Sequence, residues 1–221
     1  MPSMPELPLP TLVAMSICML ATLGLLWAEA RHARAARAAF KTVASSAFVA
    51  VALAADATAT PYGRLVLIAL ALSWLGDVLL LAQRSAVFLA GLGAFLLAHG
   101  VYAWAFAGGP LHGGALLAGT TLMIAVGAVV LRAFWPRLKP LYRIAVPAYV
   151  VAIGVMCTLA MGAGVGSGAW WLPAAALAFA ASDISVARDR FIGHAFANKA
   201  WGLPLYYAAQ LVLAASVARG L

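Results

Sequence analysis

Eight long apolar runs, separated by short polar turns, constrain this 221-residue chain more than any other feature. A helix needs about 20 mostly apolar residues to cross a bilayer, and so many runs of this length exceed what the core of a soluble domain can bury. Hydrophobic residues make up 66% of the chain and charged residues only 9%, whereas soluble domains carry roughly 25% charged residues. The sequence therefore predicts an all-α fold, a polytopic membrane bundle of about eight transmembrane helices.

The predicted helices cover the apolar runs at residues 11–28, 42–56, 65–83, 86–107, 113–133, 141–161, 169–187 and 199–218. The second run is short, so its helix is expected to extend backwards through Phe40 or to tilt differently from its neighbours. The connections are brief and leave no room for a separate soluble domain. Residues 1–221 are thus expected to form a single transmembrane domain.

The basic residues alternate between the two ends of the predicted bundle. The turns after the first, third, fifth and seventh helices carry twelve of the fourteen Lys and Arg residues, and only Arg64 and Arg219 fall on the other side. Cytoplasmic loops are enriched in Lys and Arg, so we expect a bacterial inner-membrane protein with both termini outside. The net charge of +8 follows from this pattern. The sequence has no basic face with interleaved aromatic residues, so we do not expect it to bind nucleic acid.

Two acidic residues, Asp77 and Asp183, lie inside predicted helices. The other acidic residues lie in tails or turns: Glu6, Glu29, Asp56 and Asp189. An ionised carboxylate near the bilayer centre costs about 2.5–3.5 kcal/mol even on lenient scales, so both aspartates should face the bundle interior. Each precedes an arginine by seven residues, Arg84 or Arg190, which predicts a shared helical face. A structural ion pair is one interpretation, and a carboxylate pair for acid–base catalysis is the other.

Further polar residues occur in the fourth and last predicted helices. Lys199, Tyr206 and Gln210 follow spacings that place them on one helical face, and His99 and Tyr102 share one side of their helix. We expect them to bind a substrate in the cavity of the two aspartates, which should open toward the basic end. For His99, simple packing is an equally good interpretation.

Metal-binding and nucleophile motifs do not accompany these residues. The sequence has no HxxxH or HxxE pair, no Ser-His-Asp elbow, no phosphate loop and no dinucleotide fingerprint. Cys18 and Cys157 lie singly in apolar runs, where small packing residues are common. We therefore expect no metal and no cofactor.

Several short motifs follow one another from the third predicted helix to the last. They are Ser73-x-x-Gly76-Asp77-x-x-Leu80, Phe88-x-x-Gly91-x-x-x-Phe95-x-x-x-His99-x-x-Tyr102, Pro147 with Tyr149, Ser182-Asp183, Phe191, and Pro204-Leu205-Tyr206-Tyr207-x-x-Gln210. In their order and spacing they resemble the YhhN family of lysoplasmalogenases. The family's Lys-Pro at the start of the second helix appears here as Lys41-Thr42, and Ile184-Ser185 is a variant of what usually follows the second aspartate.

The resemblance implies an enzyme that hydrolyses the vinyl ether bond of lysoplasmalogens, lysophospholipids of the membrane. The products would be a fatty aldehyde and glycerophosphocholine or glycerophosphoethanolamine. Such hydrolysis needs a proton delivered to carbon and then a water, work that two carboxyl groups share in glycosidases. Burial favours the neutral form of a carboxyl group, and Asp183, with few polar neighbours in sequence, is the preferred acid. Lys199 and Arg190 are candidates to hold the phosphate. Both also fit as ordinary basic residues of the cytoplasmic side, and for Arg190 this is the better interpretation.

Two other functions fit the same residues. Intramembrane carboxylates and a possible four-plus-four helix repeat are typical of a small proton-coupled transporter. A structural membrane protein would use the aspartates only to lock its helices. Aldehyde release by purified protein without a gradient distinguishes the enzyme from the transporter. An Asp77→Asn variant that folds but is inactive argues against the structural role.

Overall fold

The computed structural model describes residues 7–82 and 84–220, and the regular elements in this part of the chain are helices. The eight α-helices are α1 (Leu9–Ala30), α2 (Arg34–Ala54), α3 (Pro61–Leu79), α4 (Ser85–Ala107), α5 (Gly113–Phe134), α6 (Tyr142–Ser167), α7 (Trp171–Phe191) and α8 (Phe196–Ala215). Short 3-10 turns follow α5 (η1, Trp135–Arg137) and α8 (η2, Ser216–Ala218). The predicted all-α class and the eight helices are confirmed, while Glu6 lies outside the described residues.

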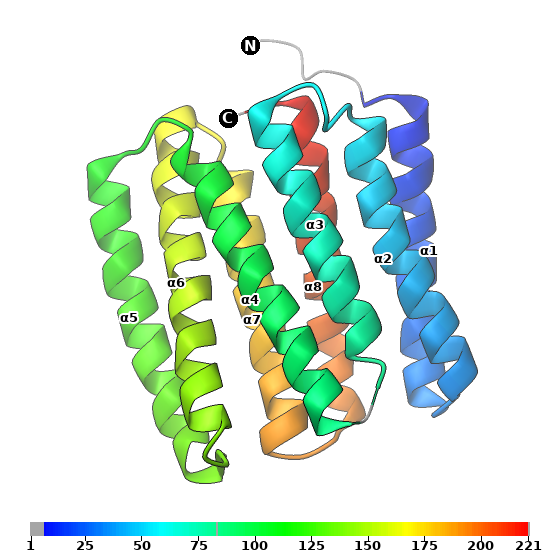
Figure 1. Ribbon diagram of the computed structural model, residues 1–221. Coiled ribbons are helices and arrows are strands. Elements are labelled where there is room, and N and C mark those ends of the chain that lie inside the picture. Colours follow the sequence, from blue (N-terminus) through cyan, green and yellow to red (C-terminus); the bar gives the residue numbers. More distant parts are fainter. Residues whose placement is uncertain (1–6, 83, 221) are drawn as a thin grey trace.

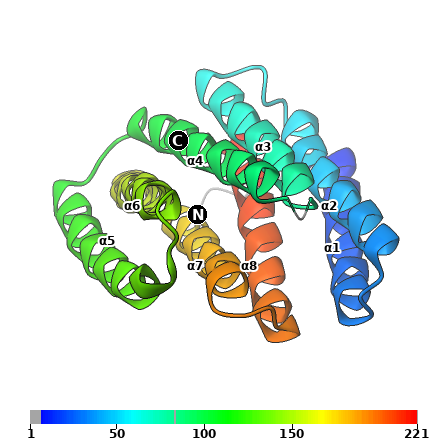
Figure 2. The ribbon, with the colours of Figure 1, turned by 60° about the horizontal axis from the view of Figure 1, so that its bottom comes forward.

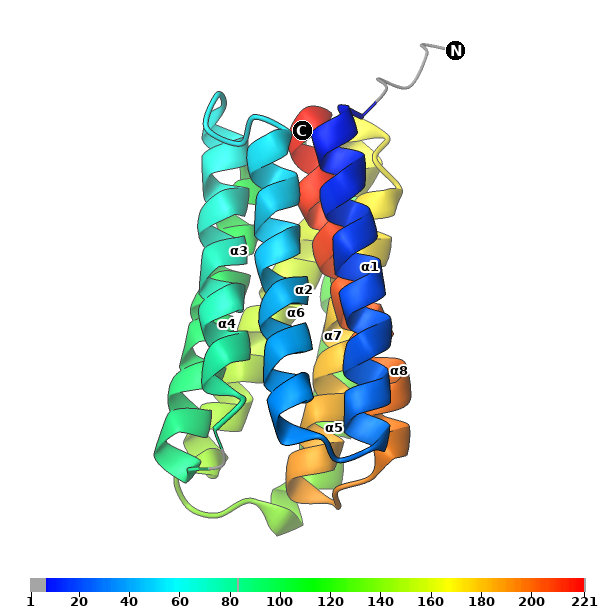
Figure 3. The ribbon, with the colours of Figure 1, turned by 90° about the vertical axis from the view of Figure 1, so that its right-hand side faces the viewer.

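The helices lie side by side along a common direction, and successive helices are antiparallel (Figure 1). α1 begins and α8 ends at one end of the bundle, and the α1–α2, α3–α4, α5–α6 and α7–α8 connections gather at the other (Figure 3). This second end, which carries the twelve basic residues counted above, is called the basic end below. The basic turns, which alternate with less charged turns along the sequence, therefore lie together at one end of the folded bundle.

Seven of the eight described α-helices are long and apolar enough to cross a membrane, which identifies an integral membrane protein. The exception is α7, whose C-terminal half carries Asp183, Arg188, Asp189 and Arg190. α7 nevertheless runs the height of the bundle beside its neighbours (Figure 1) and packs on α6 and α8. Its charges are tolerable there because interior positions can pair with other protein groups.

Several helix boundaries differ from the prediction, and three of them concern the charged residues discussed above. α2 begins at Arg34 rather than at residue 42, which confirms the expected extension backwards through Phe40 and places Lys41 inside the helix. α3 ends at Leu79, and Arg84 belongs to the connection before α4. The predicted shared face of Asp77 and Arg84 is therefore wrong. α7 continues to Phe191, which places Asp189 in its last turn instead of in a loop.

The packing of α8 brings distant segments together. α8 contacts α7 on one side and the α1–α2 pair on the other, whereas α5 is peripheral and packs on α6 (Figure 2). The close approach of α7 and α8 depends on Gly202, because a Cβ at this position would overlap the side chain of Ser185. This approach carries the polar face of α8 toward the aspartates of α3 and α7.

Candidate active site

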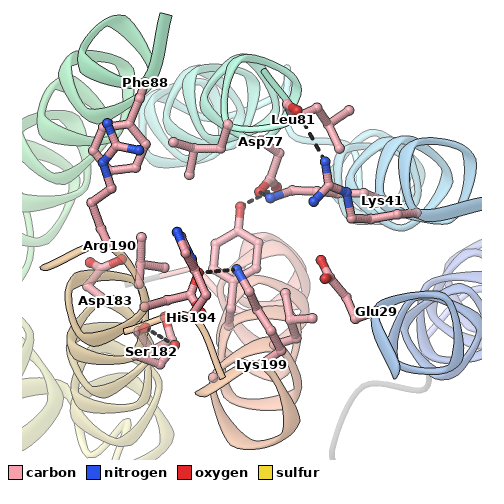
Figure 4. Close-up of a pocket in the computed structure, with 18 of the residues that line it drawn as sticks. Glu29, Lys41, Asp77, Leu81, Phe88, Ser182, Asp183, Arg190, His194 and Lys199 are labelled. Carbon is pink, nitrogen blue, oxygen red and sulfur yellow. Dashed lines mark hydrogen bonds and ion pairs between the residues drawn. The ribbon is translucent and has the colours of Figure 1, made fainter. Parts of the chain in front are cut away.

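A pocket of about 640 Å³ lies at the basic end of the bundle. Its lining includes residues of the α1–α2, α3–α4 and α7–α8 connections, which places its mouth at that end. Asp77 from α3 and Asp183 from α7 both line it (Figure 4). Tyr206 from α8 is a third residue of the lining. The two intramembrane carboxyl groups thus face one cavity that opens where the basic residues gather.

Asp77 is held by a cation and two hydroxyl groups. Lys41 Nζ lies 3.1 Å from Oδ1. The hydroxyls of Ser45 and Tyr206 each donate to Oδ2 at 2.6 Å. Ser45 Oγ is also 3.2 Å from the hydroxyl of Tyr207. An ammonium group and two hydroxyl donors thus contact the same carboxyl group, contacts that are shorter and stronger when one partner carries a charge.

Asp183 has a different set of neighbours. Tyr149 Oη donates to its Oδ2 at 3.0 Å, and His99 Nε2 lies 3.4 Å from the same oxygen. Within the described residues, no Lys or Arg lies within ion-pair distance of Asp183. The carboxyl group of Asp183 therefore has a hydroxyl group and an imidazole as neighbours, whereas that of Asp77 has an ammonium group. The two aspartates therefore share a cavity but not an electrostatic environment.

Three of the predicted substrate-binding residues are buried in the bundle and do not line the pocket. His99, Tyr102 and Gln210 are fully buried and are not among the residues that line the pocket. Tyr102 Oη donates to Gln210 Oε1 at 2.8 Å, and Gln210 Nε2 donates to Tyr206 Oη at 3.2 Å. Tyr206 in turn donates to Asp77. This chain of hydrogen bonds connects the interior of α4 and α8 to the carboxylate and fixes the orientation of Tyr206.

Aromatic rings further fix Tyr206. The rings of Phe95, Phe179 and Tyr206 are mutually edge-on, with centroids 5.4 to 6.3 Å apart. Edge-to-face contacts of this kind stabilise a buried ring beyond the area that it buries. Tyr206 is therefore positioned by its hydroxyl group and by its ring.

Lys199 lies near the mouth of the pocket in an ion pair. Its Nζ is 3.1 Å from Asp189 Oδ2, and His194 Nδ1 is 3.1 Å from the same oxygen. The backbone N–H of Ala195 donates to Asp189 Oδ1 at 3.3 Å. These contacts join the end of α7 to the start of α8. Lys199, predicted to hold a phosphate, would have to exchange Asp189 for that ligand.

Arg190, the other predicted phosphate ligand, is also engaged. Its guanidinium carbon lies 4.4 Å from the centre of the Phe88 ring. Nη2 lies 3.2 Å from Ser85 Oγ and 3.5 Å from Tyr142 Oη. These contacts tie α7 to α4 and α6.

Ser45 was not among the predicted site residues, and Lys41 and Tyr149 were only weakly indicated by the sequence. Once α2 begins at Arg34, Lys41 and Ser45 lie four residues apart on one helical face. That four-residue spacing was the signal in the sequence that could have identified Ser45. Among the described residues, no group of three His, Cys, Asp or Glu side chains is arranged to hold a metal ion.

A model of the YhhN family matches residues 36–217, most of the chain. The chain belongs to the YhhN family. It is 36% identical over 185 residues to a protein of Mycobacterium bovis named lysoplasmalogenase, covering 78% of this chain and 68% of that protein. It is 32% identical over 162 residues to lysoplasmalogenase TMEM86A of Bos taurus, with 71% and 66% covered. No solved structure matches this YhhN chain.

Proposed function

We propose that this YhhN protein is a membrane-embedded lysoplasmalogenase. It would hydrolyse the vinyl ether bond of a lysoplasmalogen to a fatty aldehyde and a glycerophospho-base. The observation that carries the proposal is the presence of Asp77 and Asp183 in the wall of one pocket at the basic end. Support also comes from relatives named lysoplasmalogenase in a bacterium and a mammal.

The contacts of the two aspartates support separate roles. The ammonium group of Lys41 lies 3.1 Å from Asp77 and provides a counter-charge for its carboxyl group. Asp183 has a hydroxyl group and an imidazole as neighbours, and burial without a cation favours a protonated carboxyl group. We therefore assign Asp183 as the general acid and Asp77 as the group that stabilises positive charge and then acts as base.

The reaction would proceed in three steps. Asp183 transfers its proton to the vinyl carbon farther from the ether oxygen, and the π electrons form the new C–H bond. The oxocarbenium ion that results lies near the Asp77 carboxylate, as in glycosidases. Water adds to the carbon bonded to the ether oxygen while Asp77 accepts its proton. The hemiacetal then collapses to the aldehyde and the glycerol hydroxyl, and proton transfer returns both carboxyl groups to their starting forms.

The lining of the pocket suits an amphiphile. Phe88, Leu92 and Val186 of α4 and α7 provide apolar surface, and the same lining carries charged side chains such as Lys41 and Lys199. Tyr206 lines the pocket and would help to orient the polar part of the lipid near Asp77. His99, Tyr102 and Gln210 would act by positioning Asp183 and Tyr206.

The test is aldehyde release by purified protein in detergent, with no ion gradient. In D2O the aldehyde, trapped at once by borohydride reduction, should carry deuterium on the carbon next to the carbonyl, because protonation occurs at carbon. Asp77→Asn and Asp183→Asn should each remain folded and lose at least about a hundredfold in kcat. Asp56→Asn, in the exposed turn at the other end, is the matched control.

Three results would overturn the proposal. No aldehyde from any vinyl ether lysolipid would exclude hydrolysis and favour the transporter. Near-normal turnover by either site variant would exclude the two-aspartate mechanism. Activity that disappears with a chelator and returns with zinc would do the same.

A further inference from the structure

Glu29 and Arg37 line the mouth of the pocket and have no role in the chemistry above. Both also line a smaller recess beside the mouth, together with Ala28, His32 and Arg34. The Glu29 carboxylate points into the pocket from the end of α1 (Figure 4). The two side chains thus place opposite charges on one side of the mouth, where α1 ends and α2 begins.

Neither charge favours the helix that carries it. Glu29 lies in the last turn of α1, next to the negative end of the helix dipole, and Arg37 lies near the positive end of α2. Each sign is the opposite of the one that stabilises a helix end. Helix stability therefore does not account for these two residues.

Arg37 also has unused capacity for hydrogen bonding. Three other cations of the lining have protein partners: Lys41 contacts Asp77, Lys199 contacts Asp189, and Arg190 contacts Ser85 and Tyr142. Arg37 Nη2 donates to the backbone oxygen of Leu81 at 3.3 Å. Its Nε is buried with no hydrogen-bond partner in the described part of the chain. A guanidinium group presents five donors and suits phosphate oxygens.

Glu29 supplies the complementary charge. Within the described ranges, no cationic side chain lies within ion-pair distance of Glu29. A partly buried carboxylate at the mouth of a pocket is stabilised when a ligand brings a positive charge to it. Glu29 and Arg37 together therefore match a ligand with one negative and one positive group.

We infer that Glu29 and Arg37 form a headgroup subsite for a phosphoethanolamine lysolipid, an inference that rests on the proposed function for the identity of the lipid. Arg37 binds the phosphate oxygens and Glu29 binds the ammonium group. With its head at this side of the mouth, the lipid would extend into the pocket that Asp77 and Asp183 also line.

The chemistry of the subsite favours ethanolamine over choline. A primary ammonium group has N–H donors that form charge-assisted hydrogen bonds with a carboxylate, whereas trimethylammonium has none. Proteins recognise trimethylammonium mainly with the faces of aromatic rings. The described lining of the recess contains no Phe, Tyr or Trp. Loss of the Glu29 charge should therefore weaken the binding of the ethanolamine lipid more than that of the other lipids.

Binding of uncleavable lipids tests the subsite without any chemistry. The ligands are saturated 1-O-alkyl lysolipids with ethanolamine, choline or no base on the phosphate, titrated against the whole protein in detergent. Arg37→Gln should lower the affinity for all three lipids by about tenfold, the scale of a charge-assisted contact. Glu29→Gln should weaken the ethanolamine lipid about fivefold, the choline lipid less, and the lipid without a base not at all. Arg31→Gln, an exposed residue of the same turn, and Asp56→Asn should bind as the wild type does.

Turnover of the corresponding vinyl ether lipids gives a second measurement. Both variants should raise KM with little change in kcat, and Glu29→Gln should remove the preference for ethanolamine. Equal losses with all three lipids in Glu29→Gln, or unchanged binding in Arg37→Gln, would overturn the subsite. If the binding pattern holds and wild-type protein releases no aldehyde, the headgroup subsite stands and the proposed hydrolysis fails.

Discussion

Lys41 Nζ lies 3.1 Å from Asp77 Oδ1, so that a cation of α2 and a carboxylate of α3 meet inside the bundle. The Asp77 side chain is 3% exposed and the Lys41 side chain 14% exposed. Removing one member of a buried pair leaves the other charge uncompensated, which costs more than removing both. The pair therefore couples the stability of the α2–α3 packing to the charge of the site.

The first prediction concerns this coupling. Lys41→Met should lower the free energy of unfolding by about 3 kcal/mol, because Asp77 loses its counter-charge. The double variant Lys41→Met with Asp77→Asn should be more stable than Lys41→Met alone. Thermal unfolding in detergent measures both, with exposed Lys139→Met as control. Strictly additive losses would show that the two residues are not coupled.

The second prediction separates Tyr206 from Tyr102. Tyr206→Phe removes a donor to Asp77 inside the pocket and should lower kcat by about tenfold or more. Tyr102→Phe leaves Gln210 Oε1 without its buried donor and should cost about 1–3 kcal/mol of stability. Because Tyr102 does not line the pocket, KM should not change. Steady-state kinetics and thermal unfolding of both variants decide the matter, and a raised KM in Tyr102→Phe would place that residue against the substrate.

The third prediction tests the contact of α7 with α8. A Cβ at Gly202 would overlap Ser185 Oγ and lie 2.6 Å from Ser185 Cβ, so Gly202→Ala should destabilise the bundle by roughly 1–3 kcal/mol. Ser185→Gly in the same chain should restore part of the loss. Gly100→Ala is the matched control, because nothing lies within 4 Å of an added Cβ there. That control should be neutral or stabilising by about 0.5–1 kcal/mol.

The fourth prediction concerns orientation in the membrane. The basic end should be cytoplasmic because it holds twelve of the fourteen Lys and Arg residues. Reporter fusions at Pro110, between α4 and α5, and at Arg137, between α5 and α6, should report opposite sides, with Arg137 inside. Reporters on the same side, or Arg137 outside, would contradict the topology.

The apolar runs were sufficient to predict the helices, because the need to satisfy backbone hydrogen bonds in lipid is a local property of each run. Helix ends were less predictable. α2 begins as early as Arg34 and α7 extends past Asp189 to Phe191, because charged residues can extend a helix beyond the membrane core. The cost of burying a charge also identified Asp77 and Asp183 as interior residues, and both line the pocket.

The sequence by itself determined that these two carboxyl groups lie in the bundle interior, since lipid offers them no partner. Only the tertiary structure decided which partners they have. Lys41 reaches Asp77 from α2, and Tyr149 reaches Asp183 from α6. No sequence spacing encodes these contacts, because they depend on how separate helices pack. The difference between the two aspartates is therefore a property of the assembled bundle, in which one carboxyl group meets a cation and the other meets a hydroxyl group and an imidazole.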